Sequence, residues 1–321
     1  MFNFKNLITK INKNKWLKNS LQKIKFFFVS IVFIIIIIIN KIKINKIKVC
    51  LCTLAKFENK YIKEFVQHYK KYGLDKIFLY DNNDINGENF EEILYDYIKK
   101  GFVKVINWRG KYQSMMKIMN DCYHKNYANF DWLIFYEIDE FIYLYNYSNI
   151  KPFLSQNNFK YCQVIHLNLV CHTDNDLLFY ENKSLFERFP KIVNNFKPNS
   201  IKLERKSIIR GHIDGVLINN NHLGDTRLKS CNSFGQQEKN KLFYSYNGDQ
   251  KYYYIDHFYS KSTEEFIEKI TKGDAIRNDP HYIYERIDKY FAQNKITKIK
   301  LDMIEKKANV NLSKYRKKLK F

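Results

Sequence analysis

Residues 48–84, KVCLCTLAKFENKYIKEFVQHYKKYGLDKIFLYDNND, predict a strand, a helix and a second strand. The run 48–54 is short and apolar, as in a buried strand. Large apolar side chains then recur across 57–72 at the spacing of one helix face, until a glycine ends the helix. The apolar run 76–80 stops at the polar cluster 81–84, which is typical of a loop. The stretch therefore predicts a β-α-β unit.

The same alternation continues toward the middle of the chain. Apolar spacing predicts helices at 90–98 and 113–126, and apolar runs predict strands at 102–108 and 131–136. Short connections and right-handed crossovers then favour a doubly wound α/β sheet.

Charged and polar residues follow each of these four strands. In a sheet of this type, ligands bind beyond the carboxyl ends of the strands. We therefore expect a site built from the polar residues at those ends, which are Lys56, Glu58, Asp81, Asn82, Arg109, Glu137 and Asp139.

Three acids follow the fourth strand, in the run Glu137-Ile-Asp139-Glu140. In an extended segment, Glu137 and Asp139 would point to one face and Glu140 to the other. Two carboxylates on one face suit Mg²⁺ or Mn²⁺, which prefer oxygen ligands. Such an ion can neutralise a diphosphate leaving group as its bond to a sugar breaks. On spacing alone, a solvated acidic turn is the alternative.

The N-terminal region contains the apolar run FFFVSIVFIIIIII at residues 26–39. Extended to 24–44, a helix would span about 31 Å, which matches a hydrocarbon core of roughly 30 Å. We expect a transmembrane anchor at 24–44, preceded by a basic segment at 1–25. A signal-peptide core and a buried soluble element are the alternatives.

Lysines flank this run unequally, with seven before it and four between it and the first strand. The excess favours a cytoplasmic N-terminus and a type II membrane protein, which in a eukaryote suits the endoplasmic reticulum or Golgi.

The formal charge of +22 is concentrated at the two ends of the chain. Residues 1–48 carry +11 and residues 295–321 carry +8, which leaves +3 for the body between them. Lysines number 47 and arginines 8, although arginine is the better residue for reading phosphates and base edges. We therefore expect no nucleic-acid partner. Residues 276–321 are expected to form a basic helical tail that either contacts anionic lipid or is solvated.

The six cysteines, at positions 50, 52, 122, 162, 171 and 231, show no metal-ligand spacing. We expect buried free thiols.

Several blocks of the body resemble glycosyltransferase family 92 and the related family 2, in the expected order. They begin with Lys56-Phe-Glu58 and with Phe78-Leu-Tyr-Asp-Asn-Asn83, and continue with the Trp132–Phe141 run. Later matching blocks are Leu185–Phe189, Lys206–Arg210 with His222, and Ile255–Ser262. This sequence has Glu137 where the family usually has Asp, and Phe258 after His257 where it has Tyr.

The resemblance implies a GT-A domain at 48–275, with a doubly wound mixed α/β sheet of Rossmann-like type. It implies a hexosyltransferase-type enzyme that uses Mn²⁺ or Mg²⁺. The donor would be a nucleotide-diphospho-sugar, a UDP-sugar for preference, and the acceptor a glycan or other glycoconjugate. Transfer would be inverting. A catalytically degenerate, membrane-tethered protein that binds sugar or nucleotide is the alternative, motivated by Glu137.

The resemblance also implies roles for single residues. Glu137, Asp139 and His257 would bind the metal. Glu187 is the candidate catalytic base, with Asp214 as a second candidate, and Glu140 would contact sugar or acceptor. Residues expected to bind the nucleotide-sugar are Lys56, Glu58, Asp81, Arg109 and Lys261.

Overall fold

The computed structural model describes residues 15–111, 115–193, 203–238, 244–245, 252–272 and 281–319. The chain divides into two compact units, residues 1–47 and 48–321. The first contains helix α2, Lys15–Lys46. Among the described residues, no helix combines the length and the apolarity needed to cross a membrane. The structure therefore supports a helix at 24–44 but does not support the expected membrane span.

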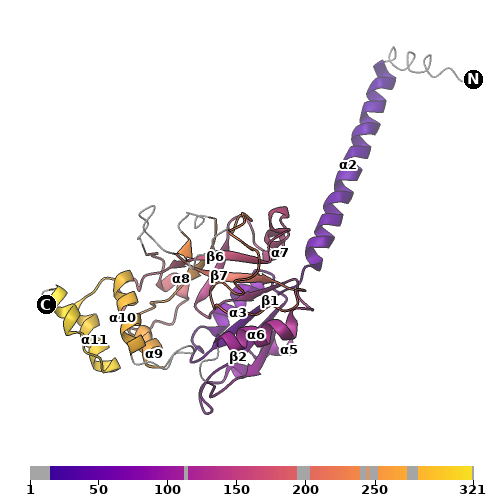
Figure 1. Ribbon diagram of the computed structural model, residues 1–321. Coiled ribbons are helices and arrows are strands. Elements are labelled where there is room, and N and C mark those ends of the chain that lie inside the picture. The colour runs from indigo at the N-terminus through magenta and orange to yellow at the C-terminus, as the bar shows by residue number, and fades with distance from the viewer. Residues whose placement is uncertain are drawn as a thin grey trace, which may run out of the picture. The chain divides into compact units, whose positions relative to one another are not determined.

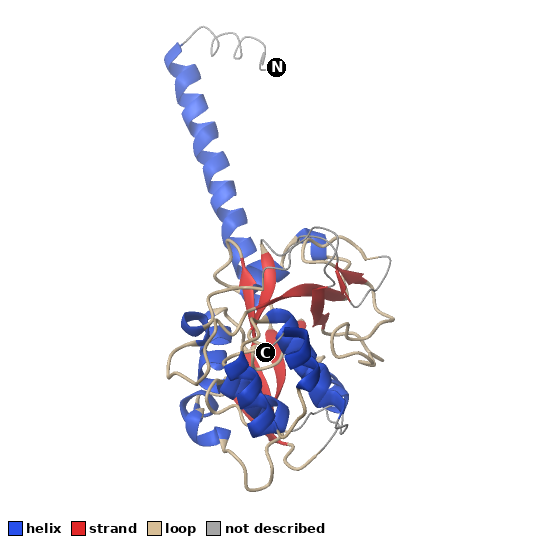
Figure 2. Cartoon of the chain, turned by 90° about the vertical axis from the view of Figure 1, so that its left-hand side faces the viewer, coloured by secondary structure: helices blue, strands red, loops and turns tan. Residues whose placement is uncertain are grey.

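The second unit is built on one mixed sheet in the order β3-β2-β1-β4-β7-β6-β10-β5, with β8 beside β6 and β9 beside β7. Strands β1 to β4 are parallel to one another, whereas β7 runs antiparallel to both β4 and β6. Figure 2 shows the strands at the centre of this unit with helices beside them. The strands are β1 Val49–Ala55, β2 Lys76–Asp81, β3 Val103–Asn107, β4 Trp132–Phe135, β5 Glu140–Leu144, β6 Val164–Cys171, β7 Leu203–Arg210, β8 Ser230–Cys231, β9 Tyr244–Ser245 and β10 Tyr253–His257.

The predicted order of strands and helices up to residue 136 is confirmed. The apolar face that predicted α3 is buried, with Ile62, Phe65, Val66 and Tyr69 in the core. The helix predicted at 90–98 is two short helices, of which α4 buries Phe90 and α5 buries no residue. The helices of the unit are α3 Ile62–Lys71, α4 Phe90–Ile93, α5 Tyr95–Lys99, α6 Met115–Asn126, α7 Ile150–Leu154, α8 Leu185–Arg188, α9 Thr263–Thr271, α10 His281–Gln293, α11 Lys298–Ala308 and α12 Ser313–Leu319.

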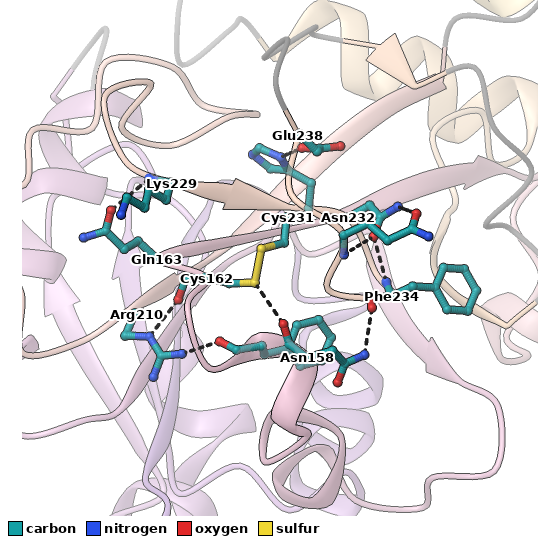
Figure 3. The surroundings of a disulfide bond; sticks show 12 residues. Asn158, Cys162, Gln163, Arg210, Lys229, Cys231, Asn232, Phe234 and Glu238 are labelled. Carbon is teal, nitrogen blue, oxygen red and sulfur yellow. Dashed lines mark hydrogen bonds and ion pairs between the residues drawn. A yellow bond between two sulfur atoms is a disulfide. The ribbon is translucent and has the colours of Figure 1, made fainter.

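Four of the six cysteines form disulfides, so the expectation of free thiols was wrong for these four. Cys52 of β1 is bonded to Cys122 of α6, and Cys162 is bonded to Cys231 of β8. Figure 3 shows the second bond beside Arg210, whose Nε donates to the carbonyl of Cys162 at 2.8 Å. The pairing joins segments about 70 residues apart in sequence, which only the fold brings together.

The C-terminal helices belong to the same compact unit as the sheet. Figure 1 shows α9, α10 and α11 grouped together. Phe266 of α9 stacks on Tyr290 of α10 at 4.1 Å between ring centroids, within a buried cluster that also includes Leu301 and Ile304 of α11. Buried Lys300 pairs with Asp174 at 2.6 Å. The described part of 276–321 is thus docked on the body and is not the free tail expected from its charge.

Candidate active site

The acids after β4 lie in a turn between two strands. Strand β4 ends at Phe135, the Glu140 N–H donates to the Glu137 carbonyl at 3.1 Å, and β5 begins at Glu140. Strand β5 pairs antiparallel with β10, which places His257 opposite Glu140. The Phe258 N–H also donates to the Asp139 carbonyl at 2.9 Å. The turn and the far end of the chain therefore meet at one point.

Asp139, Glu140 and His257 form a buried group whose ligand atoms all lie within 4.8 Å of one another. His257 Nε2 is 3.7 Å from Asp139 Oδ1. Burial lowers the pKa of His257 to about 4, although Asp139 opposes the shift, so the imidazole is neutral at pH 7. Burial works to raise the pKa of Asp139, but Lys269 and His257 outweigh it and hold this pKa well below its usual value. One ionised carboxylate, a second carboxyl group and a neutral imidazole are a donor set that Mn²⁺ or Mg²⁺ accepts.

The sequence predicted Glu137 as the partner of Asp139 and His257, but the structure places Glu140 with these two residues. The cause is the turn, because the opposite orientation of Glu140 was expected only for an extended backbone. Glu140 Oε2 accepts the Glu137 N–H at 2.9 Å, and Oε1 lies 3.1 Å from Lys206 Nζ. Burial raises the pKa of Glu140 to about 8; Lys206 opposes this shift, and the Glu137 and Asp139 carboxylates add to it.

Glu137 is paired with Lys206 of β7. Burial works to raise the pKa of Glu137, but the adjacent ammonium holds it at about 2. The buried Lys206 thus contacts both Glu137 and Glu140. Glu137 is next to the group of possible ligands but is already neutralised by another residue.

A cavity of about 550 Å³ is linked to this group by Lys269, which lines the cavity and lies 2.7 Å from Asp139. Its charged lining consists of four lysines and five carboxylates, which are Lys60, Lys261, Lys269, Lys272, Glu58, Asp84, Glu88, Glu265 and Glu268. Two of these, Glu58 and Lys261, are predicted donor-binding residues. Glu58 pairs with Lys272 at 2.6 Å and lies 3.6 Å from the ammonium of Lys261. Lys60 also pairs with Glu268 at 2.7 Å. An anionic ligand in the cavity would therefore compete with these carboxylates for the ammonium groups.

Two side chains of the cavity wall sit on strained backbone. Phe57 and Lys261 have φ of 54° and 50°, in the left-handed region that residues with a side chain seldom adopt. Such strain is concentrated at functional sites in proteins. The Lys261 ammonium lies 3.6 Å from the centroid of the Tyr61 ring.

The remaining predicted donor-binding residues lie around the loop that follows β2. Arg109 Nε donates to Asp81 Oδ2 at 2.8 Å, and its Nη2 donates to the Glu88 carbonyl at 2.6 Å. Lys56 pairs with Asp84 at 3.0 Å. Asp81 and Arg109, which were expected to bind the nucleotide-sugar, contact each other and hold this loop.

Glu187, the predicted catalytic base, forms a capping box with Ser184 at the start of α8. Its Oε2 accepts from the Ser184 hydroxyl at 2.8 Å, and these bonds lower the pKa of Glu187. Asp214 accepts the N–H of its neighbour Gly215 at 2.8 Å. Neither carboxylate belongs to the group formed by Asp139, Glu140 and His257.

Two lysines that contact the acids after β4 were missed from the sequence. Lys206 lies in the block Lys206–Arg210, so a signal was present, but its partners follow only from the pairing of β7 with β4. Lys269 lies in the last turn of α9, and its Nζ is 2.7 Å from Asp139 Oδ2. Nothing in the local sequence of α9 sets this lysine apart from the chain's many others.

Comparison with known proteins identifies the family of the chain. The model of glycosyltransferase family 92 matches residues 45–278. A glycosyltransferase family 92 protein of Ricinus communis is 21% identical over 125 residues, which cover 39% of this chain and 22% of that protein. The matched region thus spans about a fifth of the relative's length.

Solved structures give a weaker likeness. Staphylococcus aureus TarS 1-349 in complex with UDP is 14% identical, with a TM-score of 0.37 over 76% of this chain and 71% of that chain. The crystal structure of S. aureus TarS is 12% identical, with a TM-score of 0.34 over 76% of this chain and 43% of that chain. Since the family model covers most of the chain, the protein belongs to glycosyltransferase family 92.

Proposed function

We propose that the protein is a metal-dependent, inverting glycosyltransferase that uses a nucleotide-diphospho-sugar, specifically a UDP-sugar, as donor. Membership of glycosyltransferase family 92 supports the reaction class. The observation that carries the proposal is the buried group Asp139, Glu140 and His257, which Lys269 links to a cavity of about 550 Å³. A divalent ion bound there would neutralise charge on the diphosphate leaving group.

Residues of the chain supply the rest of the chemistry. Asp139, Glu140 and His257 would hold the metal ion, and Lys261, Lys269 and Lys272 would face the diphosphate across the cavity. Preorganised positive charge at a leaving group stabilises the transition state without costly reorganisation. In the transfer, the bond between the sugar's anomeric carbon and the phosphate oxygen breaks. A bond from the acceptor hydroxyl oxygen to that carbon forms, and the hydroxyl proton passes to a base.

The catalytic base and the acceptor class are proposed from the sequence alone. Glu187 stays the predicted base, although its carboxylate caps α8. A glycan or glycoconjugate is the proposed acceptor class. If Glu187 takes the acceptor proton, Glu187→Gln should lower kcat and leave the affinity for donor unchanged; an unchanged kcat would exclude it.

Release of UDP from a panel of UDP-sugars with Mn²⁺ tests the proposal. Loss of partners that support a metal ligand costs about 10- to 100-fold in affinity or activity, so we expect Asp139→Asn to lower UDP release by at least about 100-fold. Asp302→Asn is the matched control, since Asp302 is half exposed and pairs with Arg316. Equal rates for wild type and Asp139→Asn would contradict the proposal.

A catalytically degenerate binding protein is the second candidate. The observation that favours it is that lysines already neutralise two of the three acids, with Lys206 on Glu137 and Lys269 on Asp139. Calorimetry separates the candidates: tight UDP binding that is unchanged by EDTA, without turnover of any donor, would favour the degenerate protein.

We further propose that the body matures in an oxidising compartment. The two disulfides support this, because such bonds persist in secreted and lumenal proteins and are rare in the cytosol. A type II membrane anchor at 24–44 stays a prediction from the sequence. Mass spectrometry of the alkylated protein from its native cells should find these four cysteines oxidised; four free thiols would contradict the compartment.

A further inference from the structure

The ammonium group of Lys269 contacts one of the possible metal ligands, Asp139, and also lines the cavity. Lys269 Nζ lies 2.7 Å from Asp139 Oδ2 and 3.4 Å from the Tyr259 carbonyl. It also lies 4.3 Å from the centroid of the Tyr259 ring, and it is part of the cavity wall. Lys269 therefore stands between the two halves of the proposed site.

The position of Lys269 is fixed by the packing of α9. Ser262 and Glu265 form a capping box at the start of the helix, and Phe266 and Ile270 are buried in the cluster shared with α10 and α11. These contacts direct the Lys269 side chain toward the turn after β4. The packing of α9 therefore holds the Lys269 ammonium in the site, and only 17% of the side chain is exposed.

The ammonium of Lys269 and a divalent ion would compete for the same carboxylate. Two cations at contact distance from Asp139 repel each other strongly in a buried, low-dielectric site. For a metal ion to bind Asp139, Glu140 and His257, the ammonium has to leave Asp139 Oδ2. The adjacent cavity is where it can move, and an anionic ligand there would stabilise the ammonium after it has moved.

We propose that Lys269 is a latch that neutralises Asp139 until a diphosphate in the cavity takes its ammonium, so that this one side chain couples metal binding to donor binding. This inference rests on the proposed function, since it takes the cavity as the diphosphate site. It assigns Lys269 a positioning role on Asp139 and a binding role toward the diphosphate. Removing the ammonium should therefore affect the two ligands in opposite directions.

The test measures two affinities by calorimetry on wild type and on Lys269→Gln, a neutral variant that can still donate to Asp139. With Mn²⁺ alone, we expect Lys269→Gln to bind at least tenfold more tightly than wild type. With UDP alone in EDTA, we expect it to bind at least tenfold more weakly. General damage to the site would weaken both affinities, so opposite signs support a latch specifically.

Lys261→Gln is the matched control. Its ammonium lines the same cavity and its field reaches Asp139, but its nearest carboxylate is that of Glu58. This variant should weaken UDP binding and change Mn²⁺ affinity by less than threefold. Lys269→Arg keeps the charge and should therefore bind Mn²⁺ no more tightly than wild type. If Lys269→Gln does not fold, Lys269→Arg replaces it in the experiment.

Equal or weaker Mn²⁺ binding by Lys269→Gln, or tighter Mn²⁺ binding by Lys269→Arg, would overturn the latch and leave the proposed function standing. An Mn²⁺ affinity that rises as much in Lys261→Gln as in Lys269→Gln would also overturn it, because the general field would then explain the effect. If no form of the protein binds Mn²⁺ up to millimolar concentration, the proposed metal site itself fails, and the latch with it.

Discussion

His257 lies directly opposite Glu140 in the antiparallel pairing of β10 with β5. This pairing joins the acidic turn after the fourth strand to a histidine from the last strand of the sheet. The ligand set that it creates includes Glu140, whereas the sequence had favoured Glu137.

The choice between these two glutamates is directly testable. Glu140→Gln removes a carboxyl ligand from the group that contains Asp139 and His257, so we expect Mn²⁺ affinity to fall by at least about tenfold. Glu137→Gln removes the partner of Lys206 and should change the affinity less. Calorimetry with Mn²⁺ measures both, and a larger loss in Glu137→Gln would restore the assignment made from the sequence.

A buried ion pair holds the start of α9, which carries Lys269. Arg188 Nη1 lies 2.7 Å from Glu265 Oε2, and both side chains are 1% exposed. Because Arg188→Met leaves a buried carboxylate without its cation, we expect a loss of about 3–5 kcal/mol in the free energy of unfolding. Urea denaturation measures this loss.

The control for that pair is on the surface. Lys60 pairs with Glu268 at 2.7 Å, and both side chains are more than a third exposed. Lys60→Met should cost less than about 1 kcal/mol. Similar losses for the two variants would show that the Arg188–Glu265 pair does not stabilise α9.

Acid sensitivity should depend on His68. Burial lowers its pKa from 6.5 to about 4, although the hydrogen bond with the Ile142 carbonyl, at 3.0 Å, opposes the shift. In the unfolded chain, the His68 imidazole therefore binds a proton below pH 6.5, whereas in the folded chain it binds this proton only near pH 4. His68 then contributes up to about 3 kcal/mol of stability above pH 6.5, and this contribution is lost as the pH falls toward 4.

Urea denaturation at pH 7 and pH 4.5 tests this contribution. The drop in unfolding free energy between the two pH values should be smaller in His68→Gln, whose amide can still donate to Ile142. An equal drop in wild type and variant would show that His68 does not carry the acid sensitivity.

Reduction should destabilise the body. The Cys162–Cys231 bond closes a loop of 69 residues, and removing a native disulfide costs about 2–5 kcal/mol. A Cys162→Ser, Cys231→Ser double variant should lose this amount in urea denaturation and become less sensitive to dithiothreitol. Cys171→Ser, which removes a free thiol, is the control. A double variant as stable as wild type would contradict the structural role of the bond.

The fold up to residue 136 could be predicted because periodicity is a local property. The apolar faces of 57–72 and 113–126 and the apolar strands between them follow directly from residue spacing. Docking of the C-terminal helices could not be predicted in this way. It depends on a complementary surface, the face of α9 with Phe266 and Ile270, that local charge does not reveal.

The site was predictable only in part for a related reason. Asp139 was predicted from the residue types that suit a metal, and His257 from the resemblance to glycosyltransferase family 92. Glu140 was assigned to the wrong face because the prediction assumed an extended backbone. The backbone turns between Glu137 and Glu140, which changes the direction of the Glu140 side chain. Lys269 reaches Asp139 only through packing between distant segments, so its role required the tertiary structure.

The most direct test is a crystal structure of the protein with Mn²⁺ and UDP, with anomalous scattering used to locate manganese. We predict one manganese peak in contact with Asp139, Glu140 and His257, with the diphosphate in the adjacent cavity. A manganese ion bound elsewhere, or UDP bound in this cavity without manganese at Asp139, would contradict it.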